Sequence, residues 1–125
     1  MTPRDEGGQA TVELAFCLPL LALVFAGLVE TAMLGMDQVR VWHAAREGAR
    51  AAAVEPDPSA ARDAAGRAGL DGLEVAVEPE PGARAPGRPA TVSVEYPYDS
   101  RVPLVGAAFE SVVLSAQATT RIERP

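Results

Sequence analysis

The sequence predicts an α+β fold in which a long N-terminal helix, membrane-spanning in its first half, packs on a small three-stranded antiparallel sheet. Two patterns lead to this prediction. No formal charge occurs at the 16 positions between Glu13 and Glu30, and the apolar run carries no polar stripe of the kind that a surface helix shows. The last third of the chain instead alternates apolar and polar residues with a period of two, which is typical of half-buried strands.

The apolar run is close to the length that a bilayer requires. Sixteen residues at a rise of ~1.5 Å give roughly 24 Å of helix, a little less than the ~30 Å hydrocarbon core. The uncharged pattern continues beyond Glu30 to Met36 and makes up the difference. We therefore predict a transmembrane helix over residues 9–36, with a kink at Pro19, where a backbone hydrogen bond is lost.

The same helix is expected to continue out of the membrane over residues 37–54, which contain no proline. Four small or apolar residues fall on one face of this extension and are expected to pack on the sheet: Val41, Ala45, Gly48 and Ala52. Prolines at 56 and 58 should end the helix. A shorter helix is predicted over residues 59–68, with Ser59 as its N-cap.

Three strands are predicted, over residues about 73–78, 91–96 and 112–123. A loop too rich in proline to pair joins the first two strands. The connection between the second and third strands contains an apolar stretch, Val102–Phe109. Its expected role is to cover the open end of the core, and contact with a partner is the alternative.

Composition excludes several classes of function. The net charge is −6, and an acidic domain without a basic patch argues against nucleic acid as a ligand. One histidine and one cysteine, far apart in the chain, offer neither a nucleophile–base pair nor a set of metal ligands. No phosphate-binding glycine motif is present. We therefore expect a protein that is not an enzyme and that has no cofactor and no metal site.

The inner edge of the apolar run carries an unusual carboxylate, Glu13. A charged side chain at this depth is costly, so a partner for it is expected. If a peptidase cut the chain after Gly8, Gln9 would become the N-terminus and Glu13 the fifth residue. The new α-amine would then lie about one helical turn from the carboxylate. Such an arrangement resembles the processing signal of type IV prepilins, and this resemblance implies that Gly8 and Gln9 form the processing site and that Glu13 acts electrostatically in assembly.

This arrangement resembles the class III signal of type IV prepilins and pilin-like proteins. The segment A-T-V-E-L-A-F-C-L-P-L-L looks most like the TadE-like family, and A-A-R-E-G-A-R-A-A-A-V resembles the second signature of that family. The second segment supplies the family-motif helix residues Arg46, Glu47, Gly48 and Arg50, whose charged members are equally typical of a solvated helix face. The leader, residues 1–8, departs from the usual pattern because it is acidic.

The resemblance implies a pilin-like fold and a minor pseudopilin role in assembly of a tight-adherence (Flp-type) pilus or a related secretion system. It also implies that a prepilin peptidase removes the leader. The expected partners are the membrane, other pilins or pseudopilins, and the assembly platform. Within the predicted span, Gly27, Thr31 and Gly35 form a small-residue face that allows another helix to approach closely in lipid. The abundance of small residues in this chain accounts for that spacing equally well.

Two criteria predict opposite orientations of the chain in the membrane. One arginine precedes the span and three follow it closely, which by the positive-inside rule places the domain in the cytoplasm. The resemblance implies a single-pass inner-membrane protein with residues 37–125 outside the cytoplasm, and we adopt it because Glu13 has no other explanation.

Three alternatives remain at this stage: an uncleaved signal anchor, secretion with cleavage after Ala26, and an envelope domain that binds an extracytoplasmic ligand and is unrelated to pili.

Overall fold

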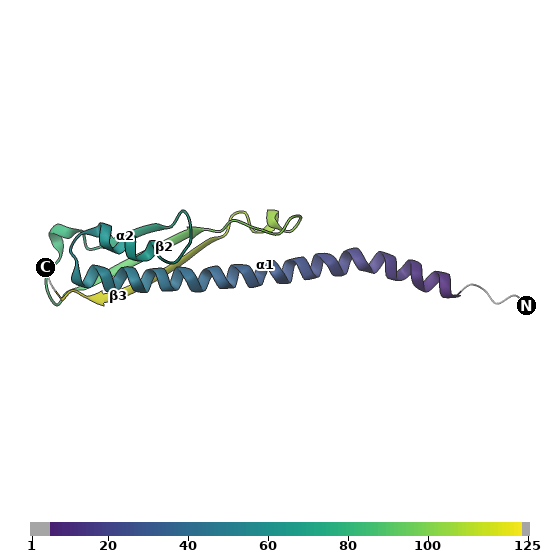
Figure 1. The fold of residues 1–125 in the computed structure, drawn as a ribbon, viewed down its shortest axis with the longest axis horizontal. Coiled ribbons are helices and arrows are strands. Elements are labelled where there is room, and N and C mark those ends of the chain that lie inside the picture. Colours follow the sequence, from purple (N-terminus) through teal and green to yellow (C-terminus); the bar gives the residue numbers. More distant parts are fainter. Residues whose placement is uncertain (1–5, 124–125) are drawn as a thin grey trace, which may run out of the picture.

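The computed structural model describes residues 6–123, so residues 1–5 of the predicted leader and the last two residues of the chain lie outside the described part. One helix, α1 (Glu6–Val54), forms 49 residues of this structure. It extends well beyond the rest of the fold, and the remaining elements gather beside its C-terminal half (Figure 1). The predicted fold class, a long apolar N-terminal helix with a three-stranded antiparallel sheet, is confirmed.

Helix α1 has no break at the predicted boundary between residues 36 and 37, and it also continues through Pro19. Proline there removes one backbone donor, and Figure 1 shows a gentle curve in the N-terminal half of the helix instead of an interruption. The helix ends at Val54 because Pro56 disfavours helical geometry at the residue before it.

The second helix, α2 (Pro58–Gly66), follows after a short turn. Its N-cap is Asp57, whose carboxylate accepts a hydrogen bond of 2.9 Å from the backbone N–H of Ser59. The predicted cap at Ser59 is therefore wrong. Pro58 has no N–H of its own and has a backbone φ suited to a first helical position, which moves the start of the helix one residue earlier.

The sheet contains β1 (Glu74–Glu78), β2 (Pro89–Pro97) and β3 (Val113–Arg121) in the order β1-β2-β3. Both pairings are antiparallel, with Val94 opposite Val75 on one side and opposite Ala116 on the other. Short 3-10 turns occur in both connections, η1 (Pro81–Ala83) and η2 (Gly106–Ala108). Helix α1 packs on β2 and β3, while α2 packs on α1 and extends to β1.

The core lies between α1, α2 and the inner face of the sheet. All four residues of the predicted packing face of α1 are buried there, which confirms that face. Alternation along β2 directs its apolar side chains inward, and α2 contributes only alanines. Small residues on both helices let the two layers approach closely. The central core residues are Val41, Ala45, Ala49, Ala52, Ala61, Ala65, Val92, Val94, Tyr96 and Leu114.

The connection between β2 and β3 only partly covers this core. Phe109 and Val112 pack against the core cluster, as the prediction for Val102–Phe109 expects of a covering segment. The other end of the connection extends past the sheet, alongside α1 and toward the N-terminal half of that helix (Figure 1). Leu104 in this part is 89% exposed, so it covers no core.

Candidate functional site

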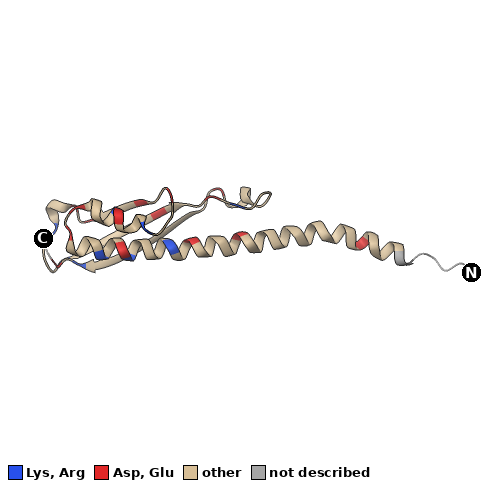
Figure 2. Cartoon of the chain, viewed as in Figure 1, with Lys and Arg blue, Asp and Glu red and all other residues tan. Residues whose placement is uncertain are grey.

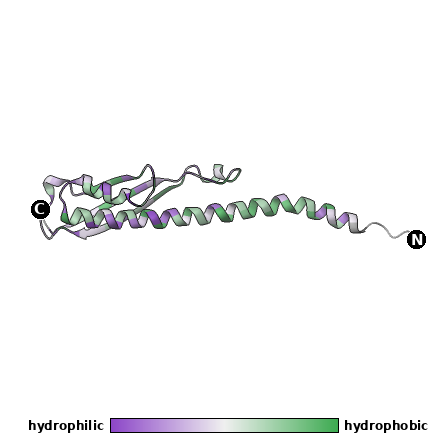
Figure 3. Cartoon of the chain, viewed as in Figure 1, coloured by the Kyte–Doolittle hydropathy of each residue, from purple (hydrophilic) through white to green (hydrophobic). Residues whose placement is uncertain are grey.

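The N-terminal part of α1 is an exposed apolar rod. Every residue from Gly8 to Phe25 is exposed, including large side chains such as Phe16, Leu20 and Phe25. Hydrophobic residues dominate this half of the helix (Figure 3), and charged side chains are concentrated in and around the domain (Figure 2). By length and composition α1 can cross a membrane. Water is a poor solvent for such a surface, so a bilayer or other apolar partner must cover it.

Glu13 lies near the N-terminal end of this rod. The side-chain amide of Gln9 donates a hydrogen bond of 3.2 Å to Glu13 Oε1, so the structure brings together two of the predicted site residues. Gly8 precedes them in the same helix, and the Gly8–Gln9 peptide bond lies inside α1. Cleavage at that bond therefore requires the first turn to unwind. After cleavage, the new α-amine and the side-chain amide that now contacts Glu13 would both belong to Gln9.

Of the three predicted helix-packing residues, Thr31 and Gly35 are exposed and Gly27 is half-buried. Apart from the helix's own neighbouring backbone, a Cβ added at Gly27 or Gly35 would have no heavy atom within 4 Å. The Thr31 hydroxyl donates a hydrogen bond of 2.8 Å to the Gly27 carbonyl. That polar group is thereby satisfied within its own helix. Contact of another helix with these residues remains a prediction.

The family-motif residues separate into two groups. Gly48 is buried where α1 crosses the sheet, and a Cβ there would lie 3.1 Å from Val92 Cγ1 and 3.3 Å from the Ala61 carbonyl oxygen. Arg46, Glu47 and Arg50 are exposed, and the Arg46 guanidinium lies 5.1 Å from the centre of the Trp42 ring. The glycine therefore has a packing role, while the charged residues form an outer face.

Sequence reasoning did not find the most deeply buried charged groups among the described residues. Glu30 and Asp37 are 0% and 1% exposed, respectively. They are seven residues apart on α1, which places them on the face that Val41 and Gly48 continue into the core. This seven-residue spacing is the signal in the sequence that would have found them. Both acids have neighbours in the β2–β3 connection, more than sixty positions later in the chain.

Asp37 is held by two arginines. Arg40 Nη1 lies 3.2 Å from Asp37 Oδ1, and Arg101 Nη2 lies 3.1 Å from Oδ2. Both arginine side chains remain 45% exposed, so each keeps contact with water while it neutralises the buried carboxylate. Arg101 belongs to the β2–β3 connection, and this ion pair attaches the connection to α1.

Glu30 is covered by the start of the same connection. The groups nearest its carboxylate are the hydroxyls of Tyr98 and Ser100 and the backbone of Arg101 and Val102. Neither Glu30 oxygen nor the Tyr98 hydroxyl makes a hydrogen bond of standard geometry within residues 6–123. Burial, with the nearby Glu30 carboxylate as the second cause, raises the pKa of Tyr98 to about 12. The connection thus encloses a carboxylate that it does not fully satisfy.

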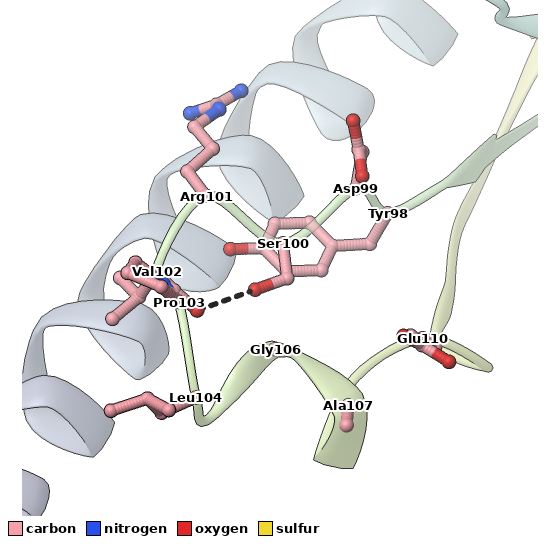
Figure 4. Close-up of a pocket in the computed structure, with 10 residues that line it drawn as sticks. All are labelled: Tyr98, Asp99, Ser100, Arg101, Val102, Pro103, Leu104, Gly106, Ala107 and Glu110. Atoms are coloured by element: carbon pink, nitrogen blue, oxygen red, sulfur yellow. Dashed lines mark hydrogen bonds between the residues drawn. The ribbon is translucent and has the colours of Figure 1, made fainter.

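The curve of the connection leaves an open hollow of about 590 Å³, lined by residues from Tyr98 to Glu110 (Figure 4). Inside the bend, the Ser100 hydroxyl donates a 3.5 Å hydrogen bond to the Val102 carbonyl.

Across the described residues, no group of three or more His, Cys, Asp and Glu side chains is placed to hold a metal ion.

Comparison with protein families identifies the N-terminal helix. Residues 8–50 match the family model described as TadE-like protein. The predicted resemblance is confirmed over that stretch. The match begins at Gly8, contains Glu13 and the motif residues Arg46, Glu47 and Gly48, and ends at Arg50, before α2 and the sheet. Comparisons with curated proteins and with solved structures give no match.

Proposed function

We propose that this chain is a minor pilin-like subunit, a pseudopilin, that takes part in assembly of a tight-adherence pilus or a related secretion system. The observation that carries the proposal is the TadE-like match over residues 8–50, which includes Glu13 at the start of an exposed apolar helix. The chain acts by docking with partners and not as an enzyme. Those partners are the inner membrane, a prepilin peptidase, other pilins or pseudopilins, and the assembly platform.

Processing creates the group that Glu13 needs. Removal of the leader after Gly8 converts a backbone amide into a charged α-amine at Gln9. Four residues of helix correspond to ~6 Å of rise, within reach of a flexible first turn. The carboxylate pairs either with this amine or with that of a neighbouring subunit. Pairing between subunits would set the axial position of a new subunit relative to its neighbour. An axial shift of one residue would separate the amine from the carboxylate, and two unpaired charges are costly in the low dielectric of the bilayer.

Glu13→Gln tests this role with almost no change in shape. We expect the variant to fold and insert normally, but to abolish pilus assembly when it replaces the natural protein in a deletion strain. The measurement is the count of pili together with the amount of membrane-localised protein. The matched control is Glu74→Gln, which removes an exposed carboxylate on β1 and should support normal assembly. Normal pili from Glu13→Gln at normal protein levels would contradict the proposal and favour the envelope-binding alternative.

A further inference from the structure

The outer limit of the membrane-spanning segment can be located from burial along α1. The residues from Gly8 to Phe25 are all exposed, Ala26 and Gly27 are half-buried, and Leu28 and Val29 are exposed again. Glu30 is then completely buried beneath the β2–β3 connection. The 20 residues from Ala10 to Val29 would span ~30 Å of helix, which equals the hydrocarbon thickness of a typical bilayer.

A deeper position of α1 is unfavourable. If the hydrocarbon extended to Met36, Glu30 and much of the connection, with its exposed Asp99 and Arg101, would lie in lipid. Charged groups and irregular backbone are costly there. The polar connection therefore begins where the hydrocarbon has to end, beside Glu30.

The end of this connection is apolar and directed toward the membrane-spanning half of α1. Its bend consists of Val102, Pro103, Leu104 and Val105, and Leu104 lies at the end farthest from Tyr98 (Figure 4). Leu104 is 89% exposed and has a φ of +73°, a backbone region in which leucine is uncommon. A solvated bend would favour glycine or asparagine at such a position. The structure instead exposes a leucine almost completely.

We propose that the bend Val102–Val105 rests in the lipid–water interface of the outer leaflet, with Leu104 inserted between lipids. This inference depends on the proposed function, because it requires that α1 spans the membrane. The connection then fixes the depth of α1, with Glu30 at the outer edge of the hydrocarbon. The polar groups of Tyr98, Ser100 and Arg101 lie just above that edge and shield the carboxylate from lipid.

Tryptophan fluorescence in vesicles measures this contact directly. The chain has one tryptophan, Trp42, so Trp42→Phe provides a silent background. Leu104→Trp is introduced there, and the full chain is reconstituted in phosphatidylcholine with brominated or unbrominated acyl chains. We expect emission from position 104 to shift to shorter wavelength and to be lost to bromine quenching. Pro103→Trp, at a second exposed position of the bend, provides an independent reporter if the first substitution disturbs folding.

Two further tryptophan variants give the upper and lower limits of bromine quenching. Leu21→Trp lies on the exposed apolar part of α1 and should be strongly quenched. Val54→Trp replaces a similarly exposed apolar residue 24 positions beyond Glu30, about 36 Å farther along the helix, and should be unaffected.

The outcomes separate this inference from the proposed function. Quenching of Leu21→Trp, with both bend reporters as unaffected as Val54→Trp, would overturn the inference and leave the membrane-spanning assignment intact. A blue shift at position 104 that grows with the protein-to-lipid ratio, without bromine quenching, would assign the bend to a second copy of the chain and also overturn it. Absence of quenching at Leu21→Trp would contradict insertion of α1 itself, and both proposals would fail.

Discussion

Glu30 and Asp37 show how residues distant in sequence determine the burial of a side chain. The sequence places Glu30 simply at the outer end of an apolar run, whereas the structure buries it completely under the β2–β3 connection. Asp37 is equally hidden but has two arginine partners, one of them 64 residues away. The seven-residue spacing places both acids on the buried face of α1, but no local pattern reveals the partners that come from the β2–β3 connection.

Tyr98 provides a spectroscopic test of this buried cluster. Burial and the neighbouring Glu30 raise its pKa from 10.0 to about 12. Because the folded pKa lies above the unfolded one, the stabilisation from the neutral phenol is intact below pH 10 and is lost as the pH rises toward 12. Absorbance at the tyrosinate wavelength, followed with circular dichroism at each pH, should show a late phenol ionisation.

Tyr98→Phe is the control for this titration, because it removes the hydroxyl and keeps the ring. The late ionisation should disappear in that variant. An unchanged titration curve would show that another tyrosine is responsible and that Tyr98 is not held beside a carboxylate.

At the scale of elements, the packing face of α1 and the strand alternation were the most predictable features. Both follow from simple periodicity: residues such as Val41 and Ala45 recur on one helix face, and the apolar residues of β2 recur every second position. The ends of elements were less predictable. Strand β2 runs from Pro89 to Pro97, wider than the predicted 91–96, because prolines are tolerated at strand ends where no ladder hydrogen bond is lost.

The predicted transmembrane and assembly residues cannot be tested by the fold of a single chain. Periodicity and a family motif indicate them, but their partners are other molecules. Gly27, Thr31 and Gly35 therefore remain predictions, although the structure leaves their face open.

Gly48 permits the close contact between α1, α2 and β2. Gly48→Val should lower the free energy of unfolding by about 1–3 kcal/mol, the usual cost of overpacking a filled site. The clash cannot be relieved easily, because Val92 is fully buried and the other neighbour is a backbone carbonyl. Denaturation of the detergent-solubilised full chain, followed by near-ultraviolet circular dichroism, measures the effect on the domain.

Gly35→Val is the matched control for this substitution. It makes the same change in the same helix, where an added Cβ has no neighbour within 4 Å. Its effect on unfolding should be close to zero, because glycine and valine differ little in helix propensity. Equal destabilisation by the two variants would show that the close contact at Gly48 has no special importance.

At the scale of the whole molecule, the chain consists of an exposed apolar rod and a small domain packed on the far half of the same helix (Figure 1). Helix α1 is continuous from the rod into the domain, so a tilt or shift of the helix in a bilayer would also move the domain.

The arginine distribution predicts a domain in the cytoplasm, whereas the family resemblance predicts a domain outside it. Measuring the orientation of the domain decides between these two predictions. We expect a reporter that works only outside the cytoplasm, fused after Pro125, to be active. A second reporter that works only in the cytoplasm should be inactive at the same position. The reverse pattern would place the domain inside and contradict a pilin-like role.

We propose above that the chain is processed and assembled as a TadE-like pseudopilin. The most direct measurement is the intact mass of protein extracted from membranes of cells with an active prepilin peptidase. We expect a mature chain that starts at Gln9, with or without the loss of ammonia that accompanies cyclisation of an N-terminal glutamine, and slower conversion in Gly8→Ala. A mature chain that starts at Gly27, or one that retains Met1, would contradict processing at Gly8.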